Sequence, residues 1–397
     1  MNMFCYQCEQ TAKGKACTAH GVCGKDPRTA ALQDLLLATA RAVSQRAHQA
    51  RKLKIGSREG DHFVVKALFA TVTNVDFDPE RLAEMIREGS STLAKTEELY
   101  KKACANAGKS PEALSKNTES VPAEKIDEMI SQARKWSIEE RKERLGEDIA
   151  GLQELLSYGL KGMAAYLDHA RILGYEDDEI YAFMHEAMDF LAKEPRDADA
   201  LLAKSLELGK WNLQTMELLD KANTESYGHP EPSSVSVTPV AGKAICVSGH
   251  DLRDLAMLLE QTKDRGINIY THGEMLPCLA YPELKKYSHL VGNYGGAWQD
   301  QRREFEAFPG AILMTTNCIQ KPKDSYKDRI FTTGLVAWPE VKHIPENSKG
   351  EKDFTPVIEA ALAAEGFSEN AEEKKINIGF ARNSVLSVAD KVVQAVK

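Results

Sequence analysis

The hydrophobic pattern changes character part-way along the chain. Over residues 29–226 apolar positions recur with the 3.6-residue period of amphipathic helices, and charged residues fill the other faces. Several such helices joined by short loops predict a helical bundle. We expect the histidines of this half at the surface or the edge of the core rather than as ligands. The apolar stripes are Leu32, Leu35, Leu36, Val43 and Ala47; Leu152, Leu155, Leu156, Met163 and Leu167; and Ile180, Phe183, Met184, Ala187 and Leu191.

After residue 226 the pattern becomes that of alternating strands and helices. YGHPEPSSVSVTPVAGK, residues 227–243, is rich in proline and serine and predicts a linker. Two strand-length apolar runs, KAICVSG and INIYTHG, flank the helical stretch LRDLAMLLEQTKD, which predicts a βαβ unit with parallel strands. SHLVGNYGG, AILMTTN and RIFTTGLVAW supply further strands. The expected fold is multi-domain, α and α/β: an N-terminal helical bundle over 29–226, then a Rossmann-like α/β sheet domain over 241–375.

Composition narrows the classes of partner. A chain of 397 residues with 43% hydrophobic content can form two or three domains with large cores. It contains 51 basic and 59 acidic residues, a formal charge of −8, and has no basic arm, so neither nucleic acid nor an anionic membrane is expected as a partner. No apolar run approaches the ~18 residues of a membrane-spanning helix. Small molecules and redox proteins remain as the expected classes of partner.

Four of the eight cysteines lie within nineteen residues, in the spacing C-x2-C-x8-C-x5-C over Cys5, Cys8, Cys17 and Cys23. The chain opens on MNMF without a secretory leader, so we expect a cytoplasmic protein whose thiols are reduced and not paired in disulfides. Structural zinc sites usually combine two C-x2-C pairs or one pair with histidines. Iron–sulfur cubanes accept looser spacing. The pattern favours an iron–sulfur cluster and leaves zinc open.

A second group of candidate ligands follows three predicted strands. His250 comes after KAICVSG, with Asp251 as the expected N-cap of the next helix; Glu274 comes after INIYT, and Cys318 after AILMTTN. Ligands bind outside the carboxyl ends of parallel strands, so imidazole, carboxylate and thiolate should converge there. Singly, each residue has an ordinary structural interpretation. Together with the upstream cysteines they predict a metal site, and Cys278 is a spare thiol close to it.

At this point the chain resembles a known family. MFCYQCEQT with its cysteine spacing, followed by SGHDL, YTHGEMLP, VGNYGGAW and TTNC, is similar to the hybrid cluster (prismane) proteins, which are hydroxylamine reductases. The resemblance implies an N-terminal helical domain and two α/β domains. It implies that Cys5, Cys8, Cys17 and Cys23 hold a 4Fe-4S cluster, and that His250, Glu274 and Cys318 are ligands of a hybrid 4Fe-2O-2S cluster.

The implied activity is the reduction of hydroxylamine to ammonia and water, with nitric oxide as a second substrate and a redox protein as electron donor. His272 is a candidate proton donor by position. The family is longer by about one domain, which brings three more cysteines and a second glutamate to the hybrid cluster. Residues 376–397 are expected to begin that domain, and the ligand set of this chain is expected to be incomplete and the chain alone inactive. The alternatives are a carbon monoxide dehydrogenase-like enzyme and a non-catalytic electron-transfer module.

Overall fold

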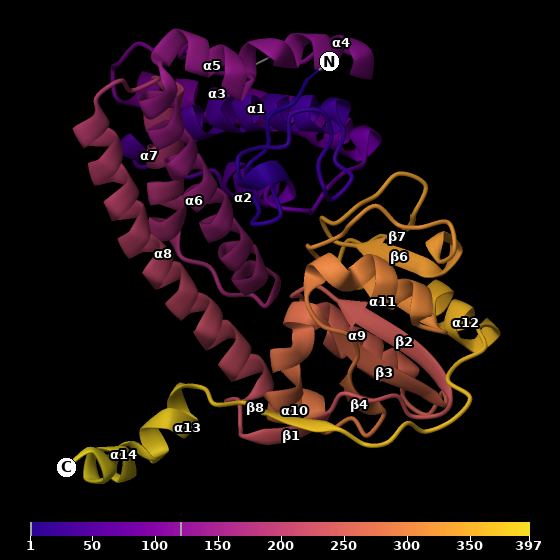
Figure 1. The fold of residues 1–397 in the computed structure, drawn as a ribbon. Helices are drawn as coiled ribbons and strands as arrows, with labels where there is room; N and C mark the ends of the chain where they lie inside the picture. The colour runs from indigo at the N-terminus through magenta and orange to yellow at the C-terminus, as the bar shows by residue number, and fades with distance from the viewer. Residues whose placement is uncertain (1, 120) are drawn as a thin grey trace. The chain divides into compact units, whose positions relative to one another are not determined.

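The computed structural model describes residues 2–119 and 121–397, which form two compact units, Met1–Leu219 and Asp220–Lys397 (Figure 1). The first unit is helical, as its hydrophobic period predicts. None of the described helices is both long enough and apolar enough to cross a membrane. The elements of this unit are η1 (Ala12–Gly14), α1 (Pro27–Lys52), α2 (Arg58–Ala70), α3 (Pro79–Asn106), α4 (Ile126–Ala133), η2 (Arg134–Trp136), α5 (Ile138–Leu145), α6 (Glu147–Ile172), α7 (Asp178–Ala192) and the first part of α8 (Ala198–Tyr227).

Helix α1 forms the centre of the helical unit. Asp26 caps it by accepting a hydrogen bond from the amide of Thr29 (2.7 Å), and Pro27 occupies its first position. Helices α2, α3, α4 and α7 all pack against α1. As a result polar side chains of α1 such as Arg41 and Gln45 are buried along with its leucines. The α6 stripe differs from expectation at Leu155, which is 52% exposed because it is one residue, or about 100°, away from buried Leu156.

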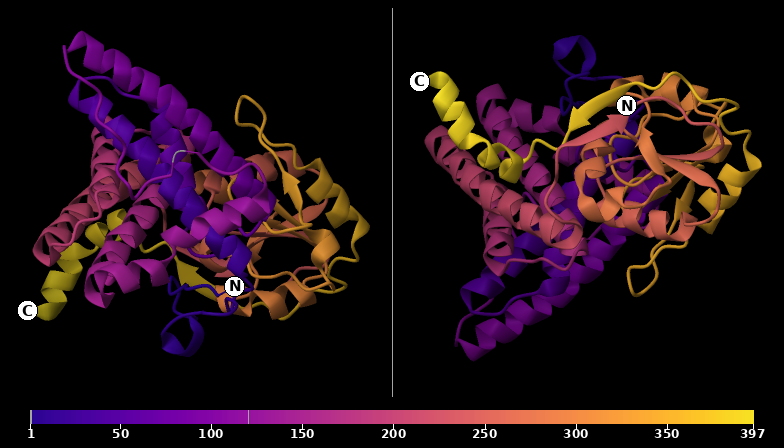
Figure 2. Two further views of the ribbon diagram at one scale, coloured as in Figure 1. Left: turned by 90° about the horizontal axis from the view of Figure 1, so that it is seen from above. Right: turned by 90° about the horizontal axis from the view of Figure 1, so that it is seen from below.

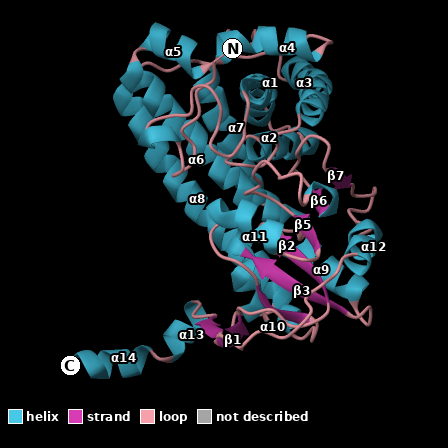
Figure 3. Ribbon diagram, turned by 45° about the vertical axis from the view of Figure 1, so that its right-hand side comes forward, coloured by secondary structure: helices cyan, strands magenta, loops and turns pink. Residues whose placement is uncertain are grey.

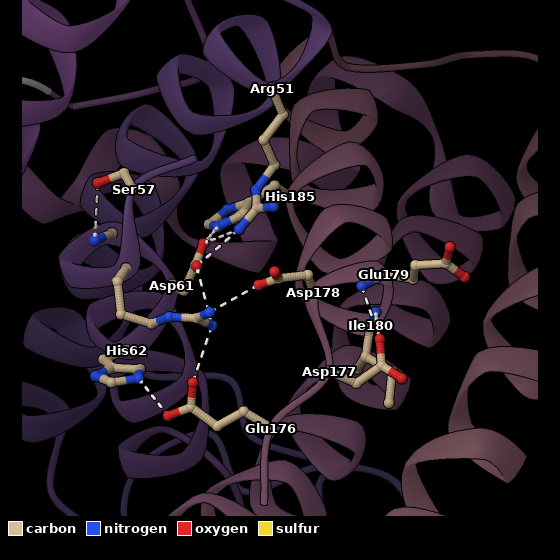
Figure 4. Close-up of polar contacts among 12 residues, drawn as sticks. Arg51, Ser57, Asp61, His62, Glu176, Asp177, Asp178, Glu179, Ile180 and His185 are labelled. Atoms are coloured by element: carbon tan, nitrogen blue, oxygen red, sulfur yellow. Dashed lines mark hydrogen bonds and ion pairs between the residues drawn. The ribbon is translucent and has the colours of Figure 1, made fainter. Parts of the chain in front are cut away.

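A buried ionic network joins α1, α2 and α7 (Figure 4). The Asp61 carboxylate accepts from Arg51 Nη2 at 2.7 Å and lies 2.8 Å from His185 Nε2. Arg58 extends the network outward to Glu176 (2.9 Å) and Asp178 (2.8 Å). His185 is fully buried, so the expectation of a surface or core-edge position is wrong for this histidine. A buried carboxylate can hold an imidazole in the core, and the sequence period does not reveal that pairing.

The second unit is built on a six-stranded parallel sheet in the order β4-β3-β2-β5-β6-β7. Figure 3 shows these strands with helices beside them. The α/β architecture expected from the strand–helix alternation is confirmed. The elements are β1 (Ser233–Ser236), β2 (Lys243–Ser248), α9 (Leu252–Thr262), β3 (Ile267–His272), η3 (Gly273–Ala280), α10 (Pro282–Lys285), β4 (Leu290–Asn293), η4 (Trp298–Asp300), α11 (Gln301–Ala307), β5 (Ala311–Met314), η5 (Lys327–Arg329), β6 (Ile330–Thr333), β7 (Lys342–Ile344), α12 (Thr355–Ala363), β8 (Lys375–Ile378), α13 (Arg382–Ser387) and α14 (Ala389–Val396).

The segment expected to be only a linker contains a strand. Within residues 227–243 the structure forms β1, which pairs antiparallel with β8, Ser233 opposite Ile378. The two strands are more than a hundred residues apart in the chain, so local sequence does not indicate their pairing. The boundaries proposed for the domains stay predictions.

Candidate metal centres

The N-terminal cysteines lie on a loop that folds back on itself. Cys5 and Cys17 form an antiparallel bridge, with amide-to-carbonyl distances of 3.1 and 2.8 Å. Thr11 reinforces it by donating from its hydroxyl to the carbonyl of Cys5 at 3.0 Å. The turn at Lys13 and Gly14 is exposed, and the loop projects from the helices in Figure 2. The fold therefore brings distant parts of the motif together near the surface of the unit.

Several donors point at the sulfurs of this loop. The amide of Ala12 donates to Cys17 Sγ at 3.4 Å, and Lys25 Nζ lies 3.9 Å from Cys5 Sγ. Burial acts to raise the pKa of the Cys17 thiol, but hydrogen bonds from the Ala12 and Val22 amides lead a set of opposing effects that lower it. Burial raises the pKa of Cys8 and of Cys23. Amides directed at sulfur are the groups that stabilise thiolates and clusters.

Glycine is needed at one position of the loop for steric reasons. A Cβ atom on Gly21 would lie 3.0 Å from Cys23 Sγ and 3.0 Å from Lys25 Cβ. The Gly21 amide also donates to the Lys25 carbonyl at 2.8 Å, which closes a turn around Cys23, the last cysteine of the motif. The four thiols and the directed amides fit the donor set of an iron–sulfur cubane. Within residues 2–119 and 121–397, no three His, Cys, Asp or Glu side chains are gathered as they would be around a single metal ion.

The second candidate centre lies at the carboxyl ends of adjacent strands of the sheet. His250 follows β2, Glu274 follows β3 and Cys318 follows β5, and β2 pairs with both of the other strands. His250 Nε2 is 3.0 Å from Glu274 Oε2. That hydrogen bond is the main cause that lowers the pKa of the Glu274 carboxyl. Asp251 caps α9, as predicted, by accepting from the amides of Arg253 and Asp254.

The loop after β5 positions the His250 ring. Thr316 Oγ1 is 2.8 Å from the His250 amide and 3.0 Å from His250 Nδ1. Gly249 makes this approach possible, because a Cβ there would be 2.4 Å from Thr315 Oγ1. Cys318, two residues beyond Thr316, is half-buried, with Asn317 Nδ2 at 3.7 Å from its sulfur. Sequence reasoning missed Thr316, although it lies within the TTNC motif.

His272 is buried at the end of β3 with both ring nitrogens engaged. Nδ1 is 3.1 Å from Ser248 Oγ, and Nε2 is 2.9 Å from Glu304 Oε2. Glu304 also accepts from the amide of Gly296 at 3.0 Å, so the glycine-rich segment GNYGGAW packs around this pair. No sequence signal identifies Glu304 as the partner of His272. The spare thiol Cys278 is buried, and burial raises its pKa.

Comparisons with known proteins show the family of this chain. Residues 3–397 match the model of the Prismane/CO dehydrogenase family. The chain belongs to this family. It is 51% identical over 399 residues to the hydroxylamine reductase of Acidithiobacillus ferrooxidans and 52% identical over 395 residues to that of Rhodospirillum rubrum. In both cases it is covered completely and spans 71% of the relative.

Solved carbon monoxide dehydrogenases of the family are more distant. The enzyme IV of Carboxydothermus hydrogenoformans matches with a TM-score of 0.42 and 15% identity, over 98% of this chain and 60% of the other. The enzyme of Thermococcus sp. AM4 matches with a TM-score of 0.41 and 14% identity, over 98% of this chain and 59% of the other. Membership of the Prismane/CO dehydrogenase family implies iron–sulfur chemistry for this chain.

Proposed function

We propose that this chain serves as a hydroxylamine reductase. The reaction consumes two electrons and two protons, breaks the N–O bond of NH2OH and releases ammonia and water. The observation that carries the proposal is the identity of about half of all residues, over the whole chain, with curated hydroxylamine reductases. The cytoplasm is the proposed compartment, and the eight free cysteines of the described chain agree with a reducing environment.

In this proposal the N-terminal loop holds a 4Fe-4S cubane through Cys5, Cys8, Cys17 and Cys23. The Ala12 amide at Cys17 and the Lys25 ammonium near Cys5 would stabilise the negative charge of bound thiolates. The exposure of the loop suits electron transfer from a donor protein.

His250, Glu274 and Cys318 are proposed as three protein ligands of the hybrid cluster. With Nδ1 held by Thr316, the His250 Nε2 atom and the Glu274 carboxylate, which contact each other at 3.0 Å, are the groups that would hold a metal. When bound, the cluster would supply Lewis-acidic iron and electrons to the N–O bond. The chain's own contribution is to orient these ligands. Three donors are fewer than a multi-iron cluster requires, so the complete ligand set stays a prediction.

His272 is proposed as a positioning and proton-holding residue. Its ring lies between Ser248 and Glu304, two residues before Glu274. A proton held at Nε2 is shared with the Glu304 carboxylate, and Ser248 offers a hydroxyl on the other side. Delivery to the leaving hydroxide would therefore pass through one of these neighbours.

The test measures ammonia from hydroxylamine with reduced viologen as electron donor. Turnover is compared between this chain and a chimera in which the segment of the Rhodospirillum rubrum relative beyond the matched region follows it. We expect turnover in the chimera, its loss by at least about a hundredfold in Glu274→Gln, and little change in the surface control Glu283→Gln. Nickel in the purified chimera, or ammonia formation unaffected by Glu274→Gln, would contradict the assignment.

A further inference from the structure

The helical unit contains a small polar cavity next to the proposed cubane ligand Cys5. It measures about 30 Å³, and one water occupies about 10–15 Å³ by this measure. It lies among the N-terminal segment, α1, α5 and α6. Its four cationic side chains are buried, and its two carboxylates, Asp34 and Glu154, keep partial exposure. The charged residues that line it are Lys25, Asp34, Arg41, Arg141, Glu154 and Lys161.

The charges around this cavity do not balance. Lys25 faces the cysteine loop, where it lies near Cys5. Arg141 forms an ion pair with Glu154, which also accepts from Tyr6 at 3.0 Å. The remaining charges are those of Arg41, Lys161 and Asp34, two positive and one negative. Buried charge without a counter-charge is costly, so one negative charge is needed to complete the site.

Two of these residues also lack hydrogen-bond partners. Asp34 and Arg41 are seven residues apart on α1, which places them two turns apart on one face. The Arg41 side chain has a buried Nε without an acceptor among the described residues, and Asp34 interacts with Arg141 and Lys161 through charge alone. Nε of Arg41, Nε of Arg141 and Nε1 of Trp136 are buried donors without an acceptor in the described chain. Buried polar groups are nearly always satisfied, so this group of donors points to an occupant.

We propose that this cavity binds one small monovalent inorganic anion, of the size of chloride or nitrite, between Arg41, Arg141 and Lys161. The anion neutralises the excess positive charge and accepts from the unpaired donors. Water fills the same space but leaves the charge uncompensated. Burial lowers the pKa of Lys161 to about 8 and of Arg41 to about 10, although the charges of Glu154 and Asp34 act in the opposite direction. The cavity borders the proposed cubane site, because Cys5 and Lys25 also line it, but the anion is not part of the proposed reduction of hydroxylamine.

Crystals grown with bromide in place of chloride locate the anion directly. We expect an anomalous peak inside the cavity within hydrogen-bond distance of the Arg41 guanidinium. Density for water alone, with no anomalous signal in the cavity, would overturn the proposal.

Thermal unfolding tests the site in solution. The melting temperature of the full chain is measured against chloride, with glutamate, too large for the cavity, keeping the ionic strength constant. A bound anion raises the melting temperature with its concentration. We expect Arg41→Gln to weaken the apparent chloride affinity by about tenfold or more, because a charged hydrogen-bond donor is removed, and the exposed control Arg87→Gln to leave it unchanged. A parallel nitrite series shows which anion binds more tightly.

A second variant keeps the test decisive if Arg41→Gln does not fold. Asp34→Asn removes the negative charge of the cavity that is not ion-paired. Burial raises the pKa of Asp34 to about 7, so above that pH the chloride response should become stronger, the opposite direction to Arg41→Gln. Iron content is matched between preparations, so that a change in the cysteine loop is not mistaken for anion binding. Equal chloride responses in wild type and in the folded variants would overturn the proposal.

Discussion

Asp61 shows how one residue can hold several helices together. Its carboxylate is buried against Arg51 and His185, so Asp61→Asn would leave the partly buried Arg51 charge without this counter-charge. We expect Asp61→Asn to lower the free energy of unfolding by about 3–5 kcal/mol. Urea denaturation measures this. Asp178→Asn, which changes an exposed member of the same network, should cost less than about 1 kcal/mol (Figure 4). Equal losses in the two variants would contradict this account.

The same carboxylate makes stability depend on pH. Burial acts to raise the pKa of Asp61, but hydrogen bonds and charge from His185 and Arg51 outweigh it and lower the pKa below its ordinary value. The stabilisation is therefore present above the unfolded pKa of about 3.9 and is lost as the pH falls through the lower folded pKa. We expect wild type to lose more stability than Asp61→Asn below about pH 4. If the free energy of unfolding fell equally steeply with pH in the two proteins below about pH 4, Asp61 would not be the cause of the acid sensitivity.

Helix packing in the first unit depends on a close approach at Gly89 of α3. A Cβ there would be 2.4 Å from Phe63 Cζ and 2.6 Å from Thr39 Cγ2, side chains of α2 and α1. We expect Gly89→Ala to destabilise the chain by about 1–3 kcal/mol despite its better helix propensity. Gly151→Ala is the matched control, because nothing lies within 4 Å of its added Cβ on α6. That variant should gain up to about 1 kcal/mol, so the two substitutions should have opposite signs in thermal melts.

The whole chain carries exposed apolar side chains on its last two helices. Leu386 is 64% exposed and Val396 is 84% exposed, and Phe380 precedes them at 65%. Such a group of apolar side chains favours association. We expect sedimentation to reveal concentration-dependent assembly that Leu386→Ser with Val396→Ser reduces, and that Lys391→Ser leaves unchanged. A monomer at all concentrations in the unaltered chain would refute this expectation.

The sequence by itself determined the helical half, the parallel sheet and the order of the motifs. These features follow from local periodicity, since apolar residues at 3.6-residue spacing bury one helix face and short apolar runs form inner strands. It also predicted the Asp251 cap, because an aspartate directly before an apolar helix accepts from the first free amides.

Only the tertiary structure decided which residues distant in the sequence contact one another. Thr316 orients His250, Glu304 pairs with His272, Asp61 binds His185, and β1 finds β8. None of these pairs shares a local pattern, because each depends on elements that meet only after folding. The spacing of the N-terminal cysteines is local and could be read directly, whereas the unbalanced charges beside them come together only when α1, α5 and α6 pack.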